Sequence, residues 1–484
     1  MFEMEIGDFE KIGPAQWRLP RKRFSSMKTD GDIFASEAIL AAAIMDGSLD
    51  QVVNVATLPS IVGNSLAMAD IHQGYGFCIG GVAAFPADEG IVLPGGVGYD
   101  INCGVRLLAT SIPVADLKQN AESLGYAILK RIPTGLTAKS NYNLDRRQFL
   151  RIIENGSEEI VRNYAGSKED LAFIESGGRL EFSRPEVISA RAFERGHSQV
   201  GSLGSGNHFI EIQAVEEVFD PEAAARFGIR EGTATVMIHT GSRGFGHQIA
   251  TDHIEILRRK YLSRIHVNDP QLVYAAIGSP EGKNYLQALN AASNFAWANR
   301  HLLMEDLIAI FERIFHSSRK NLGMKLVYDQ AHNIAKFENH RLGGRETRLL
   351  VHRKGATRAF PPLHPDVPAE YRPTGQPVIL PGSMGTPSYL LRGTDQAMDL
   401  TFGSSAHGAG RRMSRHQAIR FSGKNNVRER LKEKGILVFS LSAHTLKEEI
   451  PEAYKPIDEV VEATEEAGIS RRVARMGPLV VVKG

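Results

Sequence analysis

The stretch Leu93-Pro-Gly-Gly-Val-Gly-Tyr-Asp100-Ile-Asn-Cys103-Gly-Val-Arg106 holds four glycines, one acid and one of only two cysteines in the 484-residue chain. Glycines at this density let the backbone turn sharply and approach a ligand or another segment closely. Asp100 and Cys103 lie three residues apart in this turn, so an oxygen and a sulfur ligand could converge on one cation. The alternative is a tight turn with a surface carboxylate and a buried thiol. The other polar sites of the chain must decide between the two.

The composition is that of an ordinary globular protein, with 42% hydrophobic and 23% charged residues. The length could hold two to four average domains. The net charge of +2 gives no overall attraction for nucleic acid, so any polyanion must be held by a local patch. Two cysteines cannot form a disulfide scaffold, which indicates a reducing compartment.

Nothing in the sequence predicts contact with a membrane. No apolar run reaches the roughly 18 residues that a membrane span needs. The first six residues, Met1 to Ile6, carry acids and no apolar core segment, unlike a signal peptide. We therefore expect a cytoplasmic protein.

Hydrophobic periodicity predicts a mixed α/β fold. Helices are expected near Ile33–Met45, Leu117–Arg131, Arg147–Tyr164, Ile249–Ile265 and Asn284–Phe315. The last of these has a wide apolar stripe that is typical of a core helix. From Gly201 onward, Gly-rich turns alternate with short β-type runs at Phe209–Val215, Ala234–His239, Lys325–Tyr328, Leu349–His352, Pro377–Leu380, Leu437–Leu441 and Leu479–Val482.

The chain shows no internal repeat and no convincing linker; the Gly-rich region from Gly63 to Gly104 is too long and too apolar to be one. The candidate polar sites are spread over more than 300 residues. If they converge, the chain folds as one large α/β unit or as closely fused lobes, and we favour a single domain over residues 1–484. We expect mixed β-sheets with surrounding helices and a central pocket where these polar sites meet.

Four histidines share one context: each ends or adjoins an apolar β-type run and lies next to Gly, Ser or Asn. They are His208, His239, His332 and His407. Strand ends are where rigid elements meet site-forming loops, and neutral imidazole is the commonest protein ligand for transition metals. A single such histidine is by default a hydrogen-bonded structural residue. Four together with the opening turn make a ligand pool large enough for a two-metal site.

The chemistry of this pool suits phosphoryl transfer. A bridging thiolate would serve two ions, because a metal-bound thiol is deprotonated. Two metals a few ångströms apart can clamp the attacking and leaving oxygens of a phosphoryl transfer. By ligand softness alone, a Cys/His/Asp set indicates zinc before manganese.

Candidate phosphate-binding residues lie close to the histidines in the sequence. The Gly-rich turns Gly204–Asn207 and Gly408–Gly410 could present backbone N–H groups to phosphate. Arg195, Arg243 and Arg411 lie in or beside the motifs, where a guanidinium can grip phosphate with two hydrogen bonds. The alternative is that these arginines are solvated or paired with carboxylates. The chain has no Walker A sequence and no Gly-x-Gly-x-x-Gly in Rossmann context.

Several further residues carry separate expectations. Asp70 and His72 would face the same side of an extended segment, where they could bind a substrate hydroxyl or an ordered water. Cys78 reads as a small buried hydrophobe. Lys483 follows an apolar strand and is expected to be held in the fold. A basic cluster comprises Arg341, Arg345, Arg348, Arg353, Lys354 and Arg358. Such a cluster is by default a solvated charged face. The alternative is a track that binds a phosphodiester backbone.

These motifs together resemble those of the RtcB-type RNA-splicing ligase family. The matching segments run in family order from residue 70 to the last residue: Asp70-Ile-His-Gln-Gly-Tyr-Gly-Phe, Gly98-Tyr-Asp100-Ile-Asn-Cys103-Gly-Val-Arg, Gly204-Ser-Gly-Asn207-His208-Phe-Ile-Glu211, His239-Thr-Gly-Ser-Arg243-Gly, Ala331-His332-Asn333, His407-Gly-Ala-Gly-Arg411 and Lys483-Gly484. Any one motif is weak, whereas the set is highly specific.

The resemblance implies an RNA ligase that joins RNA 3′-phosphate or 2′,3′-cyclic phosphate ends to 5′-hydroxyl ends, in tRNA splicing or RNA repair. The family uses GTP and Mn²⁺, which replaces the expectation of zinc from ligand softness. The implied partners are RNA with such ends, such as tRNA halves, and GTP. The family often works with a small activator protein, archease.

The resemblance also implies residue roles. Two manganese ions would be held by Asp100, Cys103, His208, His239 and His332, with Cys103 bridging. His407 would attack the α-phosphorus of GTP and carry GMP. Guanosine contacts would come from Asn207, Glu211, Asn333, Ser383, Gly408, Gly410, Tyr454 and Lys483. RNA or GTP phosphates would be gripped by Arg195, Arg243 and Arg411, with Asp70 near the RNA ends.

Two other functions remain open at this point. A dinuclear metallohydrolase that opens 2′,3′-cyclic phosphates would use the same metals but would not need His407 as a nucleophile. A non-catalytic RNA- or nucleotide-binding factor would leave the large set of metal-ligand residues unexplained.

Overall fold

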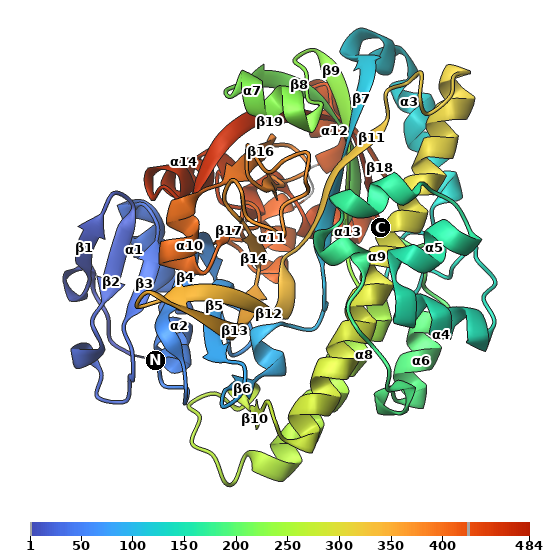
Figure 1. Cartoon of the computed structure of the whole chain (residues 1–484). Coiled ribbons are helices and arrows are strands. Elements are labelled where there is room, and N and C mark those ends of the chain that lie inside the picture. The colour runs from blue at the N-terminus through green and yellow to red at the C-terminus, as the bar shows by residue number, and fades with distance from the viewer. Residues whose placement is uncertain (1, 424–425) are drawn as a thin grey trace.

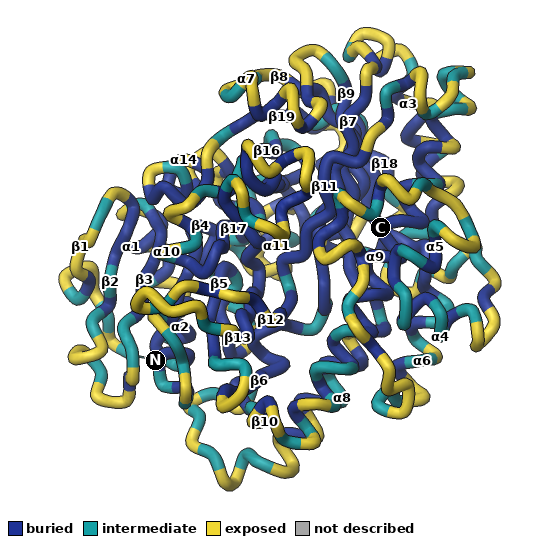
Figure 2. The backbone as a smooth tube through the Cα atoms, in the orientation of Figure 1, coloured by how far each residue is buried: buried dark blue, intermediate teal, exposed yellow. Residues whose placement is uncertain are grey.

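Two large β-sheets with helices around them form the framework of the protein (Figure 1). The computed structural model describes residues 2–423 and 426–484. Buried segments run through the strands near the centre, and exposed segments lie mainly in turns and outer helices (Figure 2). The predicted mixed α/β fold, with several sheets and surrounding helices, is confirmed.

The first sheet has seven strands, taken from the N-terminal region and from a hairpin much later in the chain. Its order is β1-β2-β3-β4-β5-β13-β12, in which β3 and β4 run parallel. The strands are β1 (Glu10–Gly13), β2 (Gln16–Leu19), β3 (Gly31–Phe34), β4 (Val62–His72), β5 (Ile79–Pro86), β12 (Asn333–Leu342) and β13 (Arg345–Lys354).

The second sheet has eight strands and contains most of the β-type runs expected beyond residue 201. Its order is β11-β7-β9-β8-β19-β16-β15, and β18 pairs with β19 in parallel. The strands are β7 (Gly104–Pro113), β8 (Phe209–Val218), β9 (Thr233–Thr240), β11 (Lys325–Ala331), β15 (Pro377–Leu380), β16 (Ser388–Gly393), β18 (Leu437–Ser440) and β19 (Ser470–Lys483).

Two short strand pairs complete the β-structure. β6 (Ile91–Val92) pairs with β10 (Ala275–Ala276), and β14 (Ala356–Arg358) pairs with β17 (Ser404–Ala406). The chain passes from the second sheet to the first between β11 and β12, and returns to the second with β15. This crossing favours one domain over residues 1–484, which stays a prediction.

Helices cover the sheets, and α3, α4 and α5 pack on the long helix α9 (Figure 1). The helices are α1 (Glu37–Asp46), α2 (Ser48–Ala56), α3 (Val114–Arg131), α4 (Arg146–Asn155), α5 (Ser157–Asn163), α6 (Ala190–His197), α7 (Pro221–Phe227), α8 (Arg243–Tyr261), α9 (Pro280–Phe315), α10 (Asp395–Thr401), α11 (Arg415–Ser422), α12 (Val427–Glu433), α13 (Ala443–Glu448) and α14 (Ile457–Glu466).

Two expected helices differ from the observed elements. The helix expected over 147–164 is two helices, α4 and α5, which meet at a break at Gly156. The helix expected from Ile33 begins only at Glu37, because Phe34 belongs to β3 and the Ser36 side chain caps α1 by accepting from the Ile39 amide. In both places a local stop signal overrides the apolar periodicity.

Helix α9 is the centre of the largest hydrophobic cluster. Its N-terminus is capped by Ser279, whose side chain accepts from the Gly282 amide, and Pro280 takes the first helical position. Leu289, Phe295 and Leu303 of the predicted stripe are fully buried. The prediction of a core helix is therefore confirmed.

No single helix in residues 2–423 and 426–484 is long and apolar enough to cross a membrane. The pair α1 and α2 reaches the required length and composition only when both are taken together, and the two helices are bent by 85° at their junction.

Helix α9 also carries buried polar residues that hold loops of the second sheet. Asn299 accepts from the Gly201 amide at 2.7 Å through its side-chain oxygen. The Arg300 guanidinium donates to the Asn102 and Thr240 carbonyls, each at 2.8 Å, and to both carboxylate oxygens of Asp329 at 2.8–3.0 Å. Arg300 and Asp329 are completely buried. This ion pair therefore ties α9 to segments next to β7, β9 and β11.

Replacing Asp329 with Asn is expected to lower the free energy of unfolding by about 3–5 kcal/mol, because it leaves buried guanidinium charges uncompensated. Arg106, whose Nε donates to Asp329 at 2.7 Å, would lose the same partner. Urea unfolding followed by circular dichroism measures the change. The exposed pair Arg259–Glu255 provides the control, since Glu255→Gln should leave the curve unchanged. Equal curves for the two variants would contradict the prediction.

Candidate metal and nucleotide site

Several strand ends meet at one edge of the second sheet. Gly104, the first residue of β7, pairs with Thr240 of β9 and with Ala331 of β11. Phe209, the first residue of β8, pairs with His239 of β9. The residues just beyond these ends, Cys103, His208 and His332, are therefore brought to the same place although they are far apart in the sequence.

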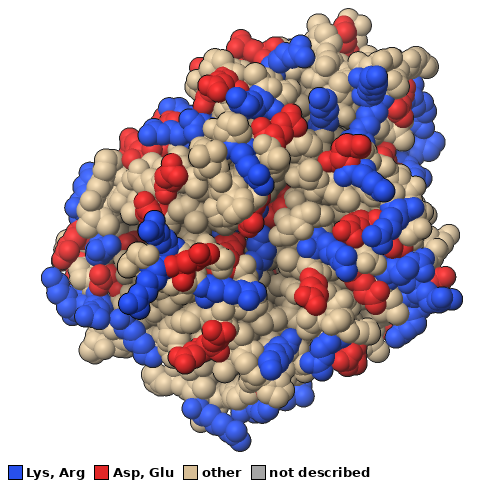
Figure 3. Space-filling model, in the orientation of Figure 1, with Lys and Arg blue, Asp and Glu red and all other residues tan. Residues whose placement is uncertain are grey.

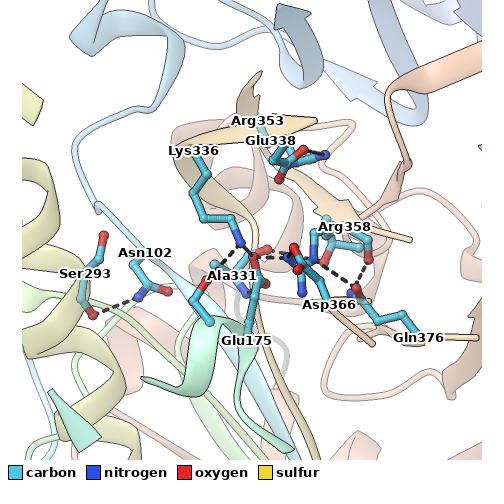
Figure 4. A network of polar contacts seen from close by, with 12 residues as sticks. Asn102, Glu175, Ser293, Ala331, Lys336, Glu338, Arg353, Arg358, Asp366 and Gln376 are labelled. Carbon is cyan, nitrogen blue, oxygen red and sulfur yellow. Dashed lines mark hydrogen bonds and ion pairs between the residues drawn. The ribbon is translucent and has the colours of Figure 1, made fainter. Parts of the chain in front are cut away.

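The opening turn is held in shape by hydrogen bonds on both sides. The Cys103 amide donates to the Asp100 carbonyl at 3.0 Å, and the His332 amide donates to the Cys103 carbonyl at 2.9 Å. Asn102 adopts a left-handed conformation with φ +53°, which asparagine tolerates better than most residues. Its side-chain amide donates to the Ser293 carbonyl at 2.8 Å (Figure 4), so the turn is fixed to α9.

The Cys103 thiol lies between two groups of candidate ligands. Its Sγ is 3.5 Å from His208 Nε2 and 3.4 Å from His239 Nε2. One group is Asp100, Cys103 and His208; the other is Cys103, His239 and His332. Within each group the ligand atoms lie within 4.8 Å of one another. The structure thus brings together all five residues expected to hold metal, with Cys103 common to both groups.

The donor atoms of these groups suit divalent transition metals. His239 Nε2 and His332 Nε2 face each other at 3.4 Å, and burial lowers the pKa of both rings well below the usual value, which keeps them neutral. Their Nδ1 atoms are buried and have no hydrogen-bond partner among the described residues. Two neutral imidazoles that present lone pairs to each other need a proton or a cation between them. A metal ion would satisfy both.

The two remaining ligands differ in charge state. Burial alone would raise the pKa of Asp100, but the hydrogen bond from His208, at 2.9 Å, holds it at about 2. Burial and the neighbouring Asp100 raise the pKa of the Cys103 thiol well above its usual value. A bound metal reverses this effect, because it deprotonates a coordinating thiol.

Helix η5 (Glu175–Gly178) holds the chain on either side of His332. Glu175 Oε2 accepts from the Ala331 amide at 2.9 Å, and Glu175 Oε1 contacts the Lys336 ammonium. Figure 4 shows Glu175 between Ala331, Lys336 and Arg358. The junction between β11 and β12 is therefore anchored by a buried carboxylate.

His407 follows β17 and forms a close pair with Asp70 of β4. Asp70 Oδ2 contacts His407 Nδ1 and also accepts from the His407 amide at 2.8 Å. Asp70 is completely buried, and in the ring tautomer whose Nδ1–H donates to its carboxylate, Nε2 carries the lone pair. Gly410 (φ +69°) makes this approach possible, since a Cβ there would lie 2.3 Å from the Asp70 carbonyl oxygen.

A pocket of about 230 Å³ opens beside His407. The His332 ring, whose centroid is 4.7 Å from that of His407, lines this pocket together with His239. The pocket is also lined by most of the residues expected to contact guanosine: Asn207, Asn333, Ser383, Gly408, Gly410, Tyr454 and Lys483. His407, two of the three expected ligand histidines and most of the expected guanosine residues therefore lie around one cavity.

Glu211 is the expected guanosine residue that does not line this pocket. It lies on β8 two residues after Phe209, so both side chains are on the same face and Phe209 stands nearer the cavity. Glu211 is buried, and its side chain accepts from Gln213 at 2.7 Å. Burial raises the pKa of Glu211 to about 8.

The three expected phosphate-binding arginines occupy different surroundings. Arg411 lines the pocket, but its Nη1 donates to Glu449 at 3.1 Å and to the Tyr454 hydroxyl at 3.2 Å. Arg243 is buried at the start of α8 and donates to the Gly135 carbonyl at 2.8 Å. Arg195 is only partly buried and donates to Gln248 at 2.9 Å. Arg411 is therefore paired with a carboxylate, which was the alternative to a phosphate-binding arginine.

Asp70, expected near the RNA ends, is buried against His407. A completely buried carboxylate with one oxygen on His407 cannot present that oxygen to RNA. The sequence placed Asp70 and His72 on one side of a strand, but no pattern indicated that His407, more than 330 residues later, would lie against it.

Glu449 and Phe209 line the pocket although nothing in the sequence indicated a functional role for them. Glu449 is buried and lies 3.6 Å from Lys483 Nζ. Its position in a Glu-Glu pair after a short helix is typical of a solvated surface. Phe209 begins an apolar strand, which predicts only core packing.

The interpretation of the basic cluster as a phosphodiester track is wrong for three of its six members. Arg353 is completely buried and pairs with Glu338 at 2.7 Å. Lys354 donates to the Tyr75 carbonyl at 2.7 Å, and buried Arg358 lies 3.3 Å from Asp366. The other three members, Arg341, Arg345 and Arg348, are exposed. Across the face in Figure 3, basic and acidic side chains are interspersed.

Two smaller expectations are confirmed. Cys78 is a buried residue of a hydrophobic cluster. Lys483 is held in the fold, because β19 pairs with β8, β16 and β18 and the Lys483 ammonium donates to the Gly206 carbonyl at 2.8 Å.

Comparison of the sequence with known proteins shows the family of the chain. The family model described as tRNA-splicing ligase RtcB matches residues 51–484. The chain belongs to the RtcB family. The tRNA-splicing ligase RtcB of Archaeoglobus fulgidus is 47% identical over 481 residues, which cover 99% of each chain. The protein of that name from Thermococcus kodakarensis is 45% identical and covers 99% of this chain and 100% of its own.

A relative from Entamoeba histolytica is similar to the chain at nearly the same identity. RNA-splicing ligase RtcB homolog 1 of Entamoeba histolytica is 44% identical over 476 residues, covering 95% of this chain and 90% of its own length. The resemblance stated from the motifs is therefore confirmed at the level of the RtcB family.

Glu211 gives a pH dependence that can be measured. In the folded protein Glu211 keeps its proton up to about pH 8, whereas unfolded glutamate loses it near pH 4.3. The folded state therefore binds more protons between these values, and this group makes stability fall as pH rises. When the pH is raised from 5 to 8, the free energy of unfolding of Glu211→Gln should therefore increase relative to that of the wild type by roughly 1–4 kcal/mol.

Urea unfolding at the two pH values tests this expectation. The exposed Glu217 on the same strand provides the matched control, and Glu217→Gln should follow the wild type at both values. A Glu211→Gln curve parallel to the wild type would show that Glu211 is ionised throughout.

Proposed function

We propose that this protein is a GTP- and Mn²⁺-dependent RNA ligase. It joins RNA 3′-phosphate or 2′,3′-cyclic phosphate ends to 5′-hydroxyl ends, in tRNA splicing or RNA repair. The observation that carries the proposal is His407, held through Nδ1 by buried Asp70, beside ligand-type histidines in one pocket. Membership of the RtcB family, whose relatives are called tRNA- or RNA-splicing ligases, supports the ligase activity.

His407 acts as the nucleophile in the first step. Because Asp70 takes the proton side of the ring, Nε2 keeps a lone pair that attacks the α-phosphorus of GTP. A P–N bond forms as pyrophosphate leaves, and the ring carries GMP. The Asp70 carboxylate offsets the positive charge that develops on the imidazole, as an orienting acid does in a catalytic triad.

RNA then takes the GMP from His407. An oxygen of the 3′-phosphate attacks the same phosphorus, the P–N bond breaks, and His407 is restored. The 5′-hydroxyl oxygen of the second RNA end attacks the 3′-phosphorus, loses its proton, and displaces GMP. A cyclic end is first opened by water to a 3′-phosphate.

Two divalent ions would be held by the five clustered ligands, one by Asp100, Cys103 and His208 and the other by Cys103, His239 and His332. Bound there, they would offset the charge of the reacting phosphates. Mn²⁺ is the ion implied by the family resemblance, whereas ligand softness favours Zn²⁺. The donor atoms of the site fit either ion.

The guanosine site is proposed on the residues that line the pocket with His407, namely Asn207, Asn333, Ser383, Gly408, Gly410, Tyr454 and Lys483. A contact from Glu211 requires guanine to reach past Phe209 and to bind the ionised carboxylate. We assign Asp70 and Arg411 positioning roles instead of RNA contacts, because Asp70 orients His407 and Arg411 holds Glu449 and Tyr454. Arg195 and Arg243 remain proposed contacts to RNA phosphates.

The wider setting follows from the same proposal. We propose that residues 1–484 act as one ligase domain, because site residues come from Asp70 through Lys483. A reducing compartment such as the cytoplasm suits the free Cys103 thiol. RNA and GTP are the proposed partners, with an archease-type activator as in the family.

His407→Ala should abolish transfer of label from α-labelled GTP to the protein in the presence of Mn²⁺. The expected wild-type product is an acid-labile, alkali-stable adduct, which is characteristic of a P–N bond. Asp70→Asn should slow labelling by about 10²–10⁴-fold, because it removes the group that sets the ring tautomer. His416→Ala, at an exposed histidine on α11, should label normally.

The same assay separates the alternative functions. A metallohydrolase would open 2′,3′-cyclic RNA ends without retaining label and would keep that activity in His407→Ala. A binding factor would do neither. Either result would overturn the ligase proposal.

Cys103→Ala should abolish Mn²⁺-dependent labelling while the far-ultraviolet circular dichroism spectrum stays that of the wild type. The thiol is the one ligand common to both candidate groups, so its loss weakens both. Cys78→Ala, at the other buried cysteine, should keep its labelling. Near-normal labelling in Cys103→Ala would exclude a shared thiolate.

A further inference from the structure

A third group of metal-ligand side chains lies apart from the pocket. It consists of Asp170, His301 and Glu305, whose ligand atoms all lie within 4.8 Å of one another. His301 and Glu305 are one turn apart on α9, and Asp170 comes from η4 (Lys168–Phe173). None of the three lines the pocket beside His407. The proposed ligation reaction gives this group no role.

His301 is left without any hydrogen bond. Its side chain is completely buried, and neither ring nitrogen has a partner among the described residues. Glu305 Oε1, 3.9 Å from His301 Nε2, is also buried without a hydrogen bond. The nearest charged partner of Glu305 Oε1 is Arg319 Nη1, at 3.7 Å, which is too far for a hydrogen bond. Buried polar atoms are almost always hydrogen-bonded, so the His301 nitrogens and Glu305 Oε1 leave room for a further partner.

The surroundings suit a cation at this point. Arg319 Nη2 donates to both oxygens of Asp170, at 2.7 and 3.0 Å, which orients the carboxylate and leaves each oxygen a second lone pair. The carboxylates of Asp170 and Glu305 share the single guanidinium of Arg319. The neighbouring Arg106 does not balance them, because it is paired with Asp329. Burial lowers the pKa of His301 well below its usual value, so the ring is in the neutral form that binds metal.

The backbone closes over the ligand atoms at Gly166. This residue has φ +112°, and a Cβ there would lie 2.5 Å from His301 Nε2 and 3.3 Å from Glu305 Oε1. Only glycine leaves that space free. Gly166 itself is exposed, so the ligand atoms lie just beneath the surface, where an ion can enter.

We propose that Asp170, His301 and Glu305 form a structural site for one divalent cation of the zinc class. Zinc takes histidine nitrogen and carboxylate oxygen at about 2.0–2.1 Å, which places tetrahedral ligand atoms about 3.3 Å apart. His301 Nε2 and Glu305 Oε1 are 3.9 Å apart, so binding would require a side-chain rotation that brings them closer. The ion would join η4 to α9, and water would complete its coordination.

The test measures zinc bound per chain in the full-length protein. Apo protein is dialysed against Zn²⁺, and bound zinc is counted by elemental analysis. Because the pocket ligands also take metal, His301→Gln is introduced into both the wild type and Cys103→Ala. In each background it should remove about one zinc per chain. The control His253→Gln, at a buried histidine on α8, should remove none.

Co²⁺ provides a second readout. The site has no sulfur ligand, so in Cys103→Ala it should give visible d–d bands without thiolate charge transfer, and His301→Gln should reduce those bands. Zn²⁺ should also raise the Tm of Cys103→Ala more than that of the double variant. Glu305→Gln, which is nearly isosteric, repeats the test if His301→Gln does not fold. Equal zinc content with and without these substitutions overturns the proposal.

Discussion

The buried ion pair between Arg300 and Asp329 is the constraint on which the arrangement of the site depends. Arg300 bonds the backbone one residue before Cys103 and one residue after His239, while Asp329 lies three residues before His332. One guanidinium thus fixes the spacing of three strands that carry candidate ligands. A planar group with five donors can satisfy so many acceptors in a dry interior, whereas an ammonium group could not.

The candidate centre also lies where the two sheets join. His332 stands between β11 of the second sheet and β12 of the first, and Asp70 comes from β4 of the first sheet. His407 meets Asp70 from β17, outside both large sheets. The nucleophile proposed here and the ligand histidines are therefore positioned by separate frameworks that meet at one pocket. Rigid strands on each side keep the reacting groups in register.

Sequence reasoning reached the elements whose signal is local. Apolar alternation located β8, β9 and β11, and the histidines at their ends were predicted to be site residues because of the Gly, Ser and Asn around them. The sequence did not predict residue pairs that are brought together only by tertiary contacts. Nothing near Asp70 predicts His407 as its partner, and nothing near Glu449 predicts burial beside Lys483. The apolar stripe of α9 likewise concealed Arg300, because a lone arginine in a helix reads as exposed. Buried charges depend on partners that are distant in sequence, so composition and periodicity do not reveal them.

Strand β19 has a consequence for how the protein is made. It lies in the interior of the eight-stranded sheet, between β8 and β16, and contributes Lys483 to the pocket. During synthesis its partner β8 emerges more than 250 residues earlier and must wait with an unpaired edge. Such long-range pairing is slow to form and leaves strand edges open to aggregation. The pocket can close only after residues 470–483 have left the ribosome, so a nascent chain that stalls before them carries metal-ligand side chains but no completed nucleotide site.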